Sequence, residues 1–242
     1  MKFSFIIPTL NEEKLLEQLL SYLTEERESK QLDYEIIVSD GASKDKTQEV
    51  ALKYCDKLIV HDYDSPQTIS DGRNKGAENA SGEIFIFING DVTLREVERL
   101  LQTIEYDFAT GKYLAWTCKV NIAPEERKMS DTIVLGFYNF YFHLLNTIGI
   151  GMGRGECQVV PSKLFREMGG YNANIVAGED FEFFKRIRLK GKIKFSREFT
   201  IFESPRRYRK KGHLQILFTW LFNSVSVMLT KRSLSRKWEE VR

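Results

Sequence analysis

An apolar run of the chain ends abruptly at polar side chains that could bind a ligand. Residues 85–88 read Phe-Ile-Phe-Ile, and Asn89, Gly90 and Asp91 follow them. Because ligands collect at the carboxyl ends of strands in open α/β sheets, a carboxylate here is well placed to hold a metal ion. Alternatively, Asp91 caps a following helix, since a carboxylate satisfies free N–H groups there. The residue types alone leave both interpretations open.

Other polar turns carry groups of the same kind. They are Pro8-Thr9-Leu10-Asn11-Glu12, Ser39-Asp40-Gly41-Ala42-Ser43, Arg73-Asn74-Lys75-Gly76 and Gly178-Glu179-Asp180. Asp40 before Gly41 is also typical of an Asx-type turn. Adjacent carboxylates at a helix start gain from the helix dipole, so Glu179 and Asp180 are either a capping pair or an acid–base pair. Arg73, a lone arginine in a predicted helix, either contacts a ligand or faces solvent.

The segments that would position these residues alternate between strand and helix patterns. Short apolar runs predict strands over residues 3–8, 35–38, 58–60 and 84–88. Apolar residues at helical spacing predict helices over residues 12–24, 45–54 and 68–80. Such alternation predicts an α/β fold with a mostly parallel sheet and helices on both faces.

The rhythm changes after Asp91. We expect strands over residues 113–120 and 157–160, and helices over residues 131–148, 162–168 and 180–189. The glycine-rich segment Gly149–Gly155 follows a helix pattern and does not join a strand to a helix, so it is not a dinucleotide fingerprint. It is interpreted as a loop that permits close approach of a substrate.

Composition is that of an ordinary globular protein. The chain has 242 residues, of which 42% are hydrophobic and 29% charged. Its cysteines, Cys55, Cys118 and Cys157, are odd in number and widely spaced, which argues against a disulfide framework or a zinc site and favours a reducing compartment. The N-terminus shows no signal-peptide pattern, so we expect a cytoplasmic protein.

Positive charge is concentrated near the C-terminus. Residues 190–242 hold 14 Lys or Arg against 4 Asp or Glu, about +10. A helix predicted over residues 214–230 places apolar residues on one face: Leu214, Leu217, Phe218, Leu221, Val225, Met228 and Leu229. This segment is too short and too polar to span a bilayer, and its basic flanks favour a helix in a membrane interface. Packing on the catalytic domain or on a dimer partner is the alternative. No base-reading motif accompanies the charge, so nucleic acid is not expected.

Five phrases occur in an order that resembles the family 2 glycosyltransferases of the GT-A fold. They are IIPTLNEE, VSDGASKDKT, RNKGAENASGEIFIFINGD, MGGYN and GEDFEFFKRIRLKG. They run from Lys2 to about Gly191, roughly four-fifths of the chain, and SPRRYRKKGH is similar to the tail of short, single-domain members. The resemblance implies a Rossmann-like GT-A domain over residues 1–205, with a nucleotide-binding half (1–91) and an acceptor-binding half (92–205). Residues 206–242 then form a basic tail with a C-terminal amphipathic helix.

The resemblance also implies an activity. Such enzymes move a sugar from a nucleoside diphosphate (UDP or GDP type) to an acceptor with inversion, and Mg²⁺ or Mn²⁺ assists the leaving diphosphate. Asp91 matches the last position of the Asp-x-Asp motif and is the expected metal ligand, while Asn89 departs from the first. Asp180 matches the catalytic base, with Glu179 in support, and His213 is a further expected metal ligand.

The remaining expected contacts concern the substrates. Pro8, Thr9, Leu10 and Asp40 would meet the nucleotide base, and Glu12 the ribose. Arg73, Arg206 and Arg207 would contact a diphosphate or a lipid phosphate, with Arg209 nearby. Glu156 and Gln158 would contact the acceptor, a glycan or lipid-linked molecule at the inner face of the cell membrane.

Two other functions are weighed against this one. Asn89 and Ser39, where relatives often have Asp, would suit a catalytically weak module that only binds nucleotide sugars. A nucleotidyltransferase is disfavoured, because the turn from Pro8 to Glu12 lacks the glycine-rich phosphate loop that such an enzyme would need.

Overall fold

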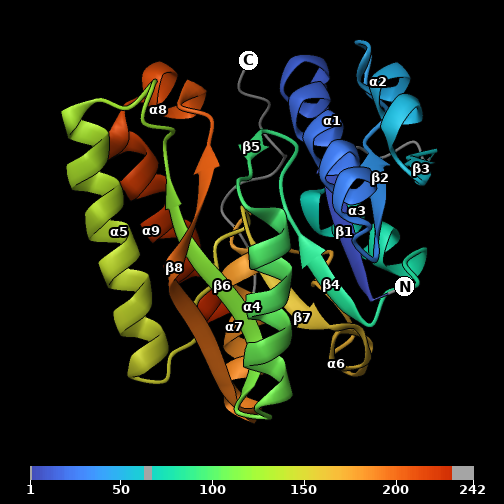
Figure 1. Cartoon of the computed structure of the whole chain (residues 1–242). Coiled ribbons are helices and arrows are strands. Elements are labelled where there is room, and N and C mark those ends of the chain that lie inside the picture. The colour runs from blue at the N-terminus through green and yellow to red at the C-terminus, as the bar shows by residue number, and fades with distance from the viewer. Residues whose placement is uncertain (1, 63–66, 231–242) are drawn as a thin grey trace.

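The computed structural model describes residues 2–62 and 67–230, and it forms one sheet with helices on both faces (Figure 1). The sheet has eight strands in the order β3-β2-β1-β4-β7-β6-β8-β5. Its first four strands are parallel: β1 (Phe3–Thr9), β2 (Tyr34–Asp40), β3 (Lys57–Val60) and β4 (Ile84–Phe87). The predicted mostly parallel, helix-flanked sheet is therefore confirmed.

The second half of the sheet contains a reversed strand. β7 (Gln158–Pro161) lies between β4 and β6 (Tyr113–Asn121) and is antiparallel to both. β8 (Lys192–Glu203) runs parallel to β6, and the short β5 (Val92–Thr93) pairs antiparallel with β8. β8 was not predicted from the sequence. A register shift against β6, between Cys118 and Lys119, interrupts the alternation by which a strand is recognised.

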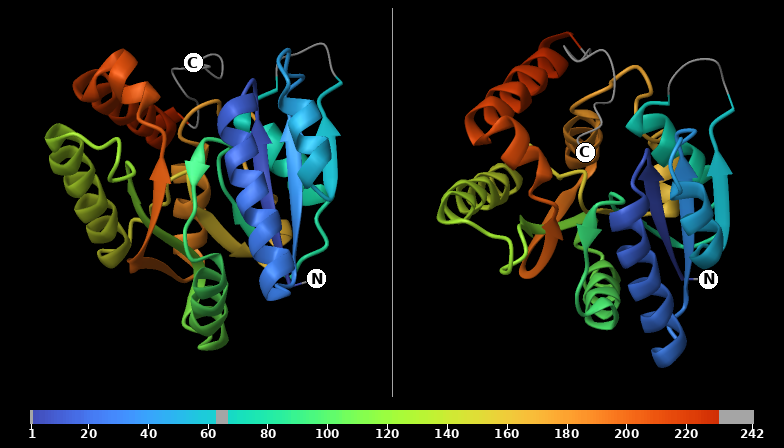
Figure 2. Two further views of the ribbon diagram at one scale, coloured as in Figure 1. Left: turned by 45° about the horizontal axis from the view of Figure 1, so that its top comes forward. Right: turned by 90° about the horizontal axis from the view of Figure 1, so that it is seen from above.

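Helices cover both faces of the sheet (Figure 2). On one face lie α1 (Glu13–Lys30), α2 (Thr47–Tyr54) and α4 (Val97–Ala109), and on the other α3 (Ile69–Glu78), α6 (Ser162–Glu167) and α7 (Glu179–Lys190). Helix α1 is held by a leucine stripe at helical spacing that is almost fully buried: Leu16, Leu19, Leu20 and Leu23. Helix α4 was missed, although its buried residues have the same spacing: Val97, Leu100, Leu101 and Ile104.

The position at which α4 begins tests whether Asp91 caps a helix. The residue before α4 is Glu96, in a left-handed conformation with φ 56°, and Asp91 directly precedes β5 instead. Asp91 therefore does not cap a helix, and that interpretation was wrong. Its carboxylate remains available at the end of β4.

A third hydrophobic cluster joins α5 (Met129–Thr147), α8 (Arg206–Lys211) and α9 (His213–Thr230) beside the sheet (Figures 1 and 2). The predicted C-terminal helix is thus present. Its buried Ile216 packs in this cluster, whereas Leu214, Phe218 and Phe222 are exposed. The side chains of Leu221, Val225, Met228 and Leu229 and the basic residues beyond Thr230 lie outside the described residues. Within residues 2–62 and 67–230, no helix has the length and hydropathy to cross a bilayer.

Candidate active site

The turns after β1, β2 and β4 lie side by side at one edge of the sheet. Thr9 pairs with Asp40 between β1 and β2, and Ile6 pairs with Phe87 between β1 and β4. Gly90 packs so closely that a Cβ on it would lie 3.1 Å from Thr9 Cγ2. The register thus brings together three of the polar turns that the sequence singled out.

Asp40 is fully buried and hydrogen-bonded within the protein. Its oxygens accept from Thr9 Oγ1 at 3.0 Å, from the Ser43 N–H at 2.8 Å and from Gln48 Nε2 at 2.9 Å. The Gly41 N–H donates to the Thr9 carbonyl, so the turns at Pro8–Leu10 and at Asp40 hold each other. The side chain of Asp40 thus stabilises its own turn, through an N–H three residues on instead of the two of an Asx turn.

Glu12, Asp91 and Arg206 meet although they are far apart in the sequence. Arg206 Nη2, from α8, donates to Glu12 Oε2 at 2.7 Å and to Asp91 Oδ2 at 3.4 Å. Burial and the charge of Asp91 raise the pKa of Glu12 to about 7, against the opposing effect of Arg206. Arg206 supplies positive charge to both carboxylates, whose hard oxygen atoms are also of the type that Mg²⁺ or Mn²⁺ prefers.

Arg73 connects the end of β4 to the start of α7. It is fully buried, donating from Nη1 to Glu179 Oε1 at 2.7 Å and from Nη2 to Asn89 Oδ1 at 3.2 Å. Nη2 also donates to the carbonyl of Gly155, a residue whose added Cβ would lie 2.5 Å from this nitrogen. The solvent-facing interpretation of Arg73 was wrong, because this arginine crosslinks three segments of the site.

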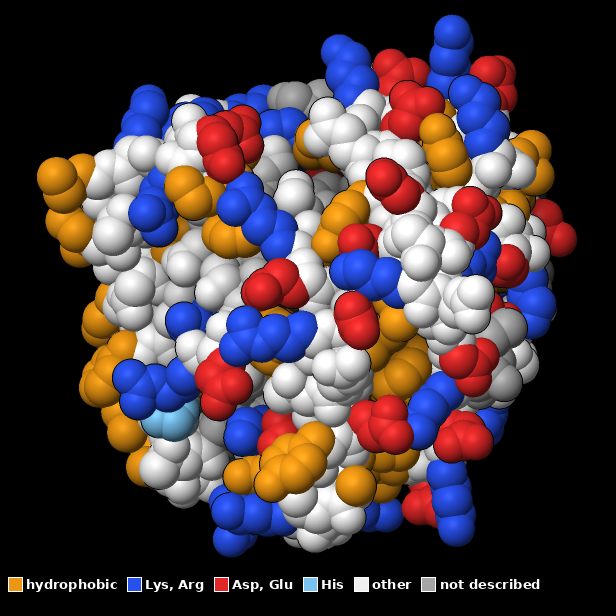
Figure 3. Space-filling model, in the orientation of Figure 1, with side chains coloured by type: hydrophobic (Ala, Val, Ile, Leu, Met, Phe, Trp, Pro, Cys, Tyr) orange, Lys and Arg blue, Asp and Glu red, His pale blue; other side chains and the backbone are white. Residues whose placement is uncertain are grey.

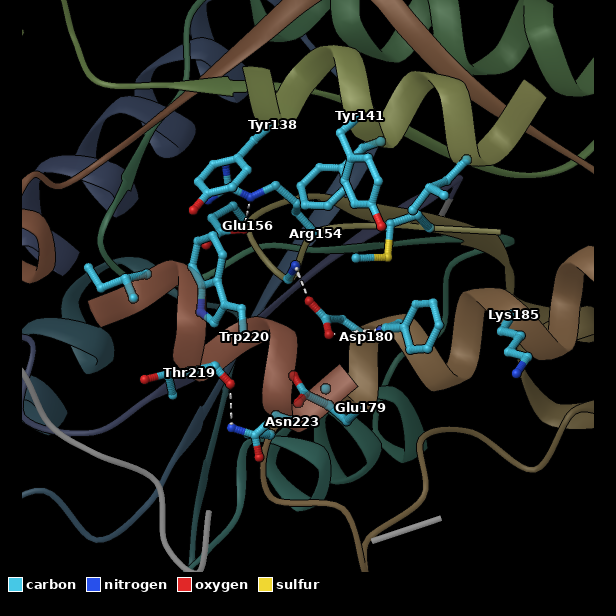
Figure 4. Close-up of a pocket in the computed structure, with 18 of the residues that line it drawn as sticks. Tyr138, Tyr141, Arg154, Glu156, Glu179, Asp180, Lys185, Thr219, Trp220 and Asn223 are labelled. Atoms are coloured by element: carbon cyan, nitrogen blue, oxygen red, sulfur yellow. Dashed lines mark hydrogen bonds and ion pairs between the residues drawn. The ribbon is translucent and has the colours of Figure 1, made fainter. Parts of the chain in front are cut away.

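Asp180 lies in the first turn of α7, with its side chain toward the centre of a cavity (Figure 4). Its carboxylate accepts from the N–H groups of Gly155 at 3.0 Å and Phe181 at 2.8 Å. Burial and the nearby charge of Glu179 raise the pKa of Asp180 to about 7, although Arg73 opposes the rise. A carboxylate with this pKa can accept a proton from a hydroxyl near neutral pH.

Gln158 supports this turn rather than facing a ligand. It is fully buried, accepts from Tyr171 Oη at 2.6 Å and donates from Nε2 to the Asp180 carbonyl at 3.2 Å. It does not line the cavity that contains Asp180. The acceptor contact expected of Gln158 therefore stays a prediction without support from the cavity, whereas Glu156 does line that cavity.

The cavity has a volume of about 820 Å³ and lies between α5, α7 and α9 (Figure 4). Arg73, Asn89, Glu179 and Asp180 line its polar part, whereas Asp40 and Asp91 are outside its lining. Arg207 also lines it and forms no hydrogen bond or ion pair among the residues that the structure describes. Although burial acts to lower it, the charges of Asp91 and Glu156 keep the pKa of Arg207 above its ordinary value.

His213 lies at a different place from the one expected of a metal ligand. Its Nε2 is 2.8 Å from Asp131 Oδ1, and Arg209 Nη2 donates to the other oxygen of Asp131 at 2.6 Å. The hydrogen bond from Arg209 holds the pKa of Asp131 well below its ordinary value. Across residues 2–62 and 67–230, no cluster of three or more His, Cys, Asp or Glu could hold a metal ion. His213 and Arg209 thus join α8 and α9 to α5.

Several residues of the cavity escaped the sequence analysis. Arg154 is buried, donates to Glu156 at 3.1 Å and Glu203 at 2.7 Å, and lies over the Trp220 ring at 5.3 Å. The sequence did hold a signal for Arg154, because this charged residue stands inside the glycine-rich segment Gly149–Gly155. Tyr138 and Trp220 gave none, because aromatic residues at helical spacing are typical of any buried helix.

Comparisons with known proteins agree with this geometry. The sequence profile described as Glycosyl transferase family 2 matches residues 4–169. The poly(ribitol-phosphate) beta-N-acetylglucosaminyltransferase TarS of Staphylococcus aureus is 36% identical over 95 residues, which are 38% of this chain and 16% of that protein. The dolichol-phosphate mannosyltransferase of Pyrococcus furiosus is 33% identical over 137 residues, 53% of this chain and 38% of that protein. The matches thus span less than half the length of either relative.

Solved structures of low sequence identity share the fold. The mannosyltransferase PcManGT from Pyrobaculum calidifontis, in complex with GDP-Man and Mn²⁺, has a TM-score of 0.67 at 19% identity, covering 88% of this chain and 62% of that one. TarS residues 1–349, in complex with UDP-GlcNAc, gives 0.62 at 19% identity, covering 84% and 58%. With the profile matching most of its length, this chain belongs to glycosyl transferase family 2, and the solved structures show that it has the GT-A fold.

Proposed function

We propose that this glycosyltransferase inverts the anomeric carbon and that Asp180 is its catalytic base. The observation that carries the proposal is the carboxylate of Asp180, which lines a large cavity and has a pKa of about 7. The acceptor O–H gives its proton to Asp180 while the acceptor oxygen bonds to the anomeric carbon. The bond from that carbon to the diphosphate breaks, and the nucleoside diphosphate leaves with the electron pair.

The donor is proposed to lie along the turns after β1, β2 and β4. Pro8, Thr9, Leu10 and Asp40 would surround the base. Arg206 and Arg207 would face the diphosphate, because guanidinium groups match phosphate oxygens. Arg73 would act indirectly, since its guanidinium already binds Asn89 and Glu179. Relatives in complex with GDP-Man and with UDP-GlcNAc support a nucleoside diphosphate sugar.

A divalent cation fits the chemistry of Asp91 and Glu12. Held by these two carboxylates, it would supply positive charge opposite the leaving diphosphate. Arg206 carries such a charge between the two carboxylates, which supports the assignment. The Mn²⁺ in PcManGT supports it further. We do not include His213 among the proposed ligands, because its Nε2 is engaged with Asp131.

We also propose peripheral contact with the inner face of the membrane and a glycan or lipid-linked acceptor. The exposed apolar side chains of Leu214, Phe218 and Phe222 on α9 support the membrane contact. Co-sedimentation with vesicles that contain about one third anionic lipid tests this contact. We expect the protein to bind the vesicles, and we expect binding to be lost when Leu214 and Phe218 are changed to Ser.

The experiment that tests the activity screens UDP- and GDP-sugars with Mn²⁺ and follows slow donor hydrolysis by proton NMR. Release of the opposite anomer first is expected of an inverting enzyme, and release of the donor's own anomer would contradict the proposal. A module that only binds nucleotide sugars is favoured by one observation, the engagement of the Asn89 oxygen by Arg73. Nucleotide binding without any hydrolysis or transfer would establish that second function.

A further inference from the structure

The cavity next to Asp180 has two ends of different chemistry. At the sheet edge its lining includes Arg73, Asn89 and Asp180. Toward α5 the lining becomes mainly apolar, with Leu145, Met152 and Ile216 among its residues, whereas Thr219 and Asn223 of α9 add polar groups (Figure 4). Aliphatic side chains such as these offer no hydrogen bonds to a hydroxyl-rich glycan, but they match a hydrocarbon chain.

The apolar end is held in place by aromatic contacts between the two helices. The Tyr138 ring of α5 and the Trp220 ring of α9 are 5.4 Å apart. The Arg154 guanidinium also lies over the Trp220 ring, and it is held there by an ion pair with Glu203. The side of the cavity that α5 and α9 form, called the wall below, is therefore a packed part of the fold. The cavity beside it is preformed, as is usual for small-molecule sites.

The rim of the apolar end is exposed to solvent. Phe137, Tyr141 and Ile150 line the cavity, yet their side chains are 59%, 40% and 40% exposed. Phe137 belongs to a row of exposed residues at helical spacing on the outer face of α5: Met129, Ile133, Phe137, Phe140, Leu144 and Ile148. Figure 3 shows hydrophobic side chains along the edge that α5 forms. Exposed apolar rows of this size are typical of interaction sites.

From these observations we infer that the cavity binds an acceptor with an apolar chain. The acceptor hydroxyl lies at Asp180, and the chain runs between α5 and α9 and leaves past Phe137. The inference rests on the proposed function, because it assigns the acceptor of that same site. It excludes an acceptor that is polar throughout, since such a molecule would leave the apolar wall unused.

The test measures binding of methyl, hexyl, octyl and decyl β-D-glucopyranosides by calorimetry, each below its critical micelle concentration. Burying one CH₂ contributes about 0.8 kcal/mol, and about 1.4 kcal/mol corresponds to a tenfold change in affinity. Affinity is therefore expected to rise roughly fourfold per methylene. Equal affinities of the methyl and decyl glucosides would overturn the inference.

A pair of variants on α5 separates the cavity from the outer row. Phe137→Ser, at the rim, is expected to weaken decyl glucoside binding at least about tenfold. Phe140→Ser is the matched control, because Phe140 is 63% exposed and does not line the cavity, and it should bind as the unchanged protein does. Equal weakening in both variants would mean adhesion to the outer face and would overturn the inference.

A parallel thermal shift with UDP and GDP in the presence of Mn²⁺ tests the proposed function separately. Nucleotide stabilisation together with a flat chain-length series would leave the proposed function intact and remove the apolar acceptor. Absence of nucleotide stabilisation would remove the proposed function, and with it the role of any bound chain as an acceptor.

Discussion

The turns at the strand ends (residues 8–12, 39–43 and 88–91) and the wall formed by α5 and α9 differ in how they are built. In the turns, almost every polar group has a partner close in space, as Asp40 has in Thr9, Ser43 and Gln48. The wall is built mainly from aromatic and aliphatic side chains, with polar bonds at one end, where Asp131 of α5 contacts Arg209 and His213. The turns fix one geometry for a charged ligand, whereas the wall sets only a volume and a polarity. If the proposed donor binds at the turns and the proposed acceptor at the wall, the two substrates are selected by different physical interactions.

The largest expected effect is on turnover. Changing Asp180→Asn removes the proton acceptor while keeping the shape of the turn, so turnover should fall about 10²–10⁴-fold. Binding of nucleoside diphosphate, measured by thermal shift, should persist, because the turns at the strand ends are untouched. Glu182→Gln on the same helix is the control, since Glu182 pairs with Arg186 at the surface. Turnover of Asp180→Asn that matches the control would remove Asp180 from the mechanism.

The second effect concerns the crosslink that Arg73 makes between the end of β4 and the start of α7. Arg73→Met leaves Glu179 buried without its partner, so the free energy of unfolding in urea should drop by about 3–5 kcal/mol. Lys75→Met, on the exposed side of the same helix, should change it by less than about 1 kcal/mol. If both variants unfold at the same urea concentration, Arg73 is not the link that the contacts indicate.

The third effect is confined to the strand-end turns. Asp91→Ala removes one of the two carboxylates that face Arg206, so Mn²⁺ should lose its enhancement of nucleoside diphosphate affinity, by about tenfold or more. Alkyl glucoside binding at the wall should be unaffected. An undiminished effect of Mn²⁺ would show that the cation is held by other groups.

The smallest effect is a shift in pH dependence. A base must be deprotonated to act, and the pKa of Asp180 is about 7, so kcat should rise as the pH rises through neutrality and then level off. Glu179→Gln removes a neighbouring negative charge and frees the charge of Arg73, and both changes lower the pKa of Asp180. The profile should therefore move about one pH unit to lower pH. A shift to higher pH would contradict the assignment.

The sequence predicted the strand-end turns better than the wall, for physical reasons. Polar residues that end an apolar run have few roles open to them, so Glu12, Asp91 and Asp180 could be singled out as candidates without coordinates, and their roles stay predictions. Arg206 was predicted only as a phosphate contact. Its ion pair with Glu12 could not be predicted, because the two residues are 194 positions apart in the sequence. The reversed direction of β7 and the irregular alternation of β8 likewise depend on pairings between distant segments. Tyr138 and Trp220 resemble any buried aromatic residue until the helices are packed.

The reversal of β7 has a consequence for engineering. Because β7 runs against β4, the chain enters it at the edge where Asn89 lies, and the preceding loop reaches Arg73 and Asp180 without crossing the sheet. A parallel β7 would begin at the opposite edge and carry that loop away from the chemistry. Residues 149–153 pack tightly on α7, where a Cβ on Gly151 would lie 2.8 Å from the Phe184 carbonyl oxygen, so a redesign of the cavity should keep the length of this loop and vary the side chains around it.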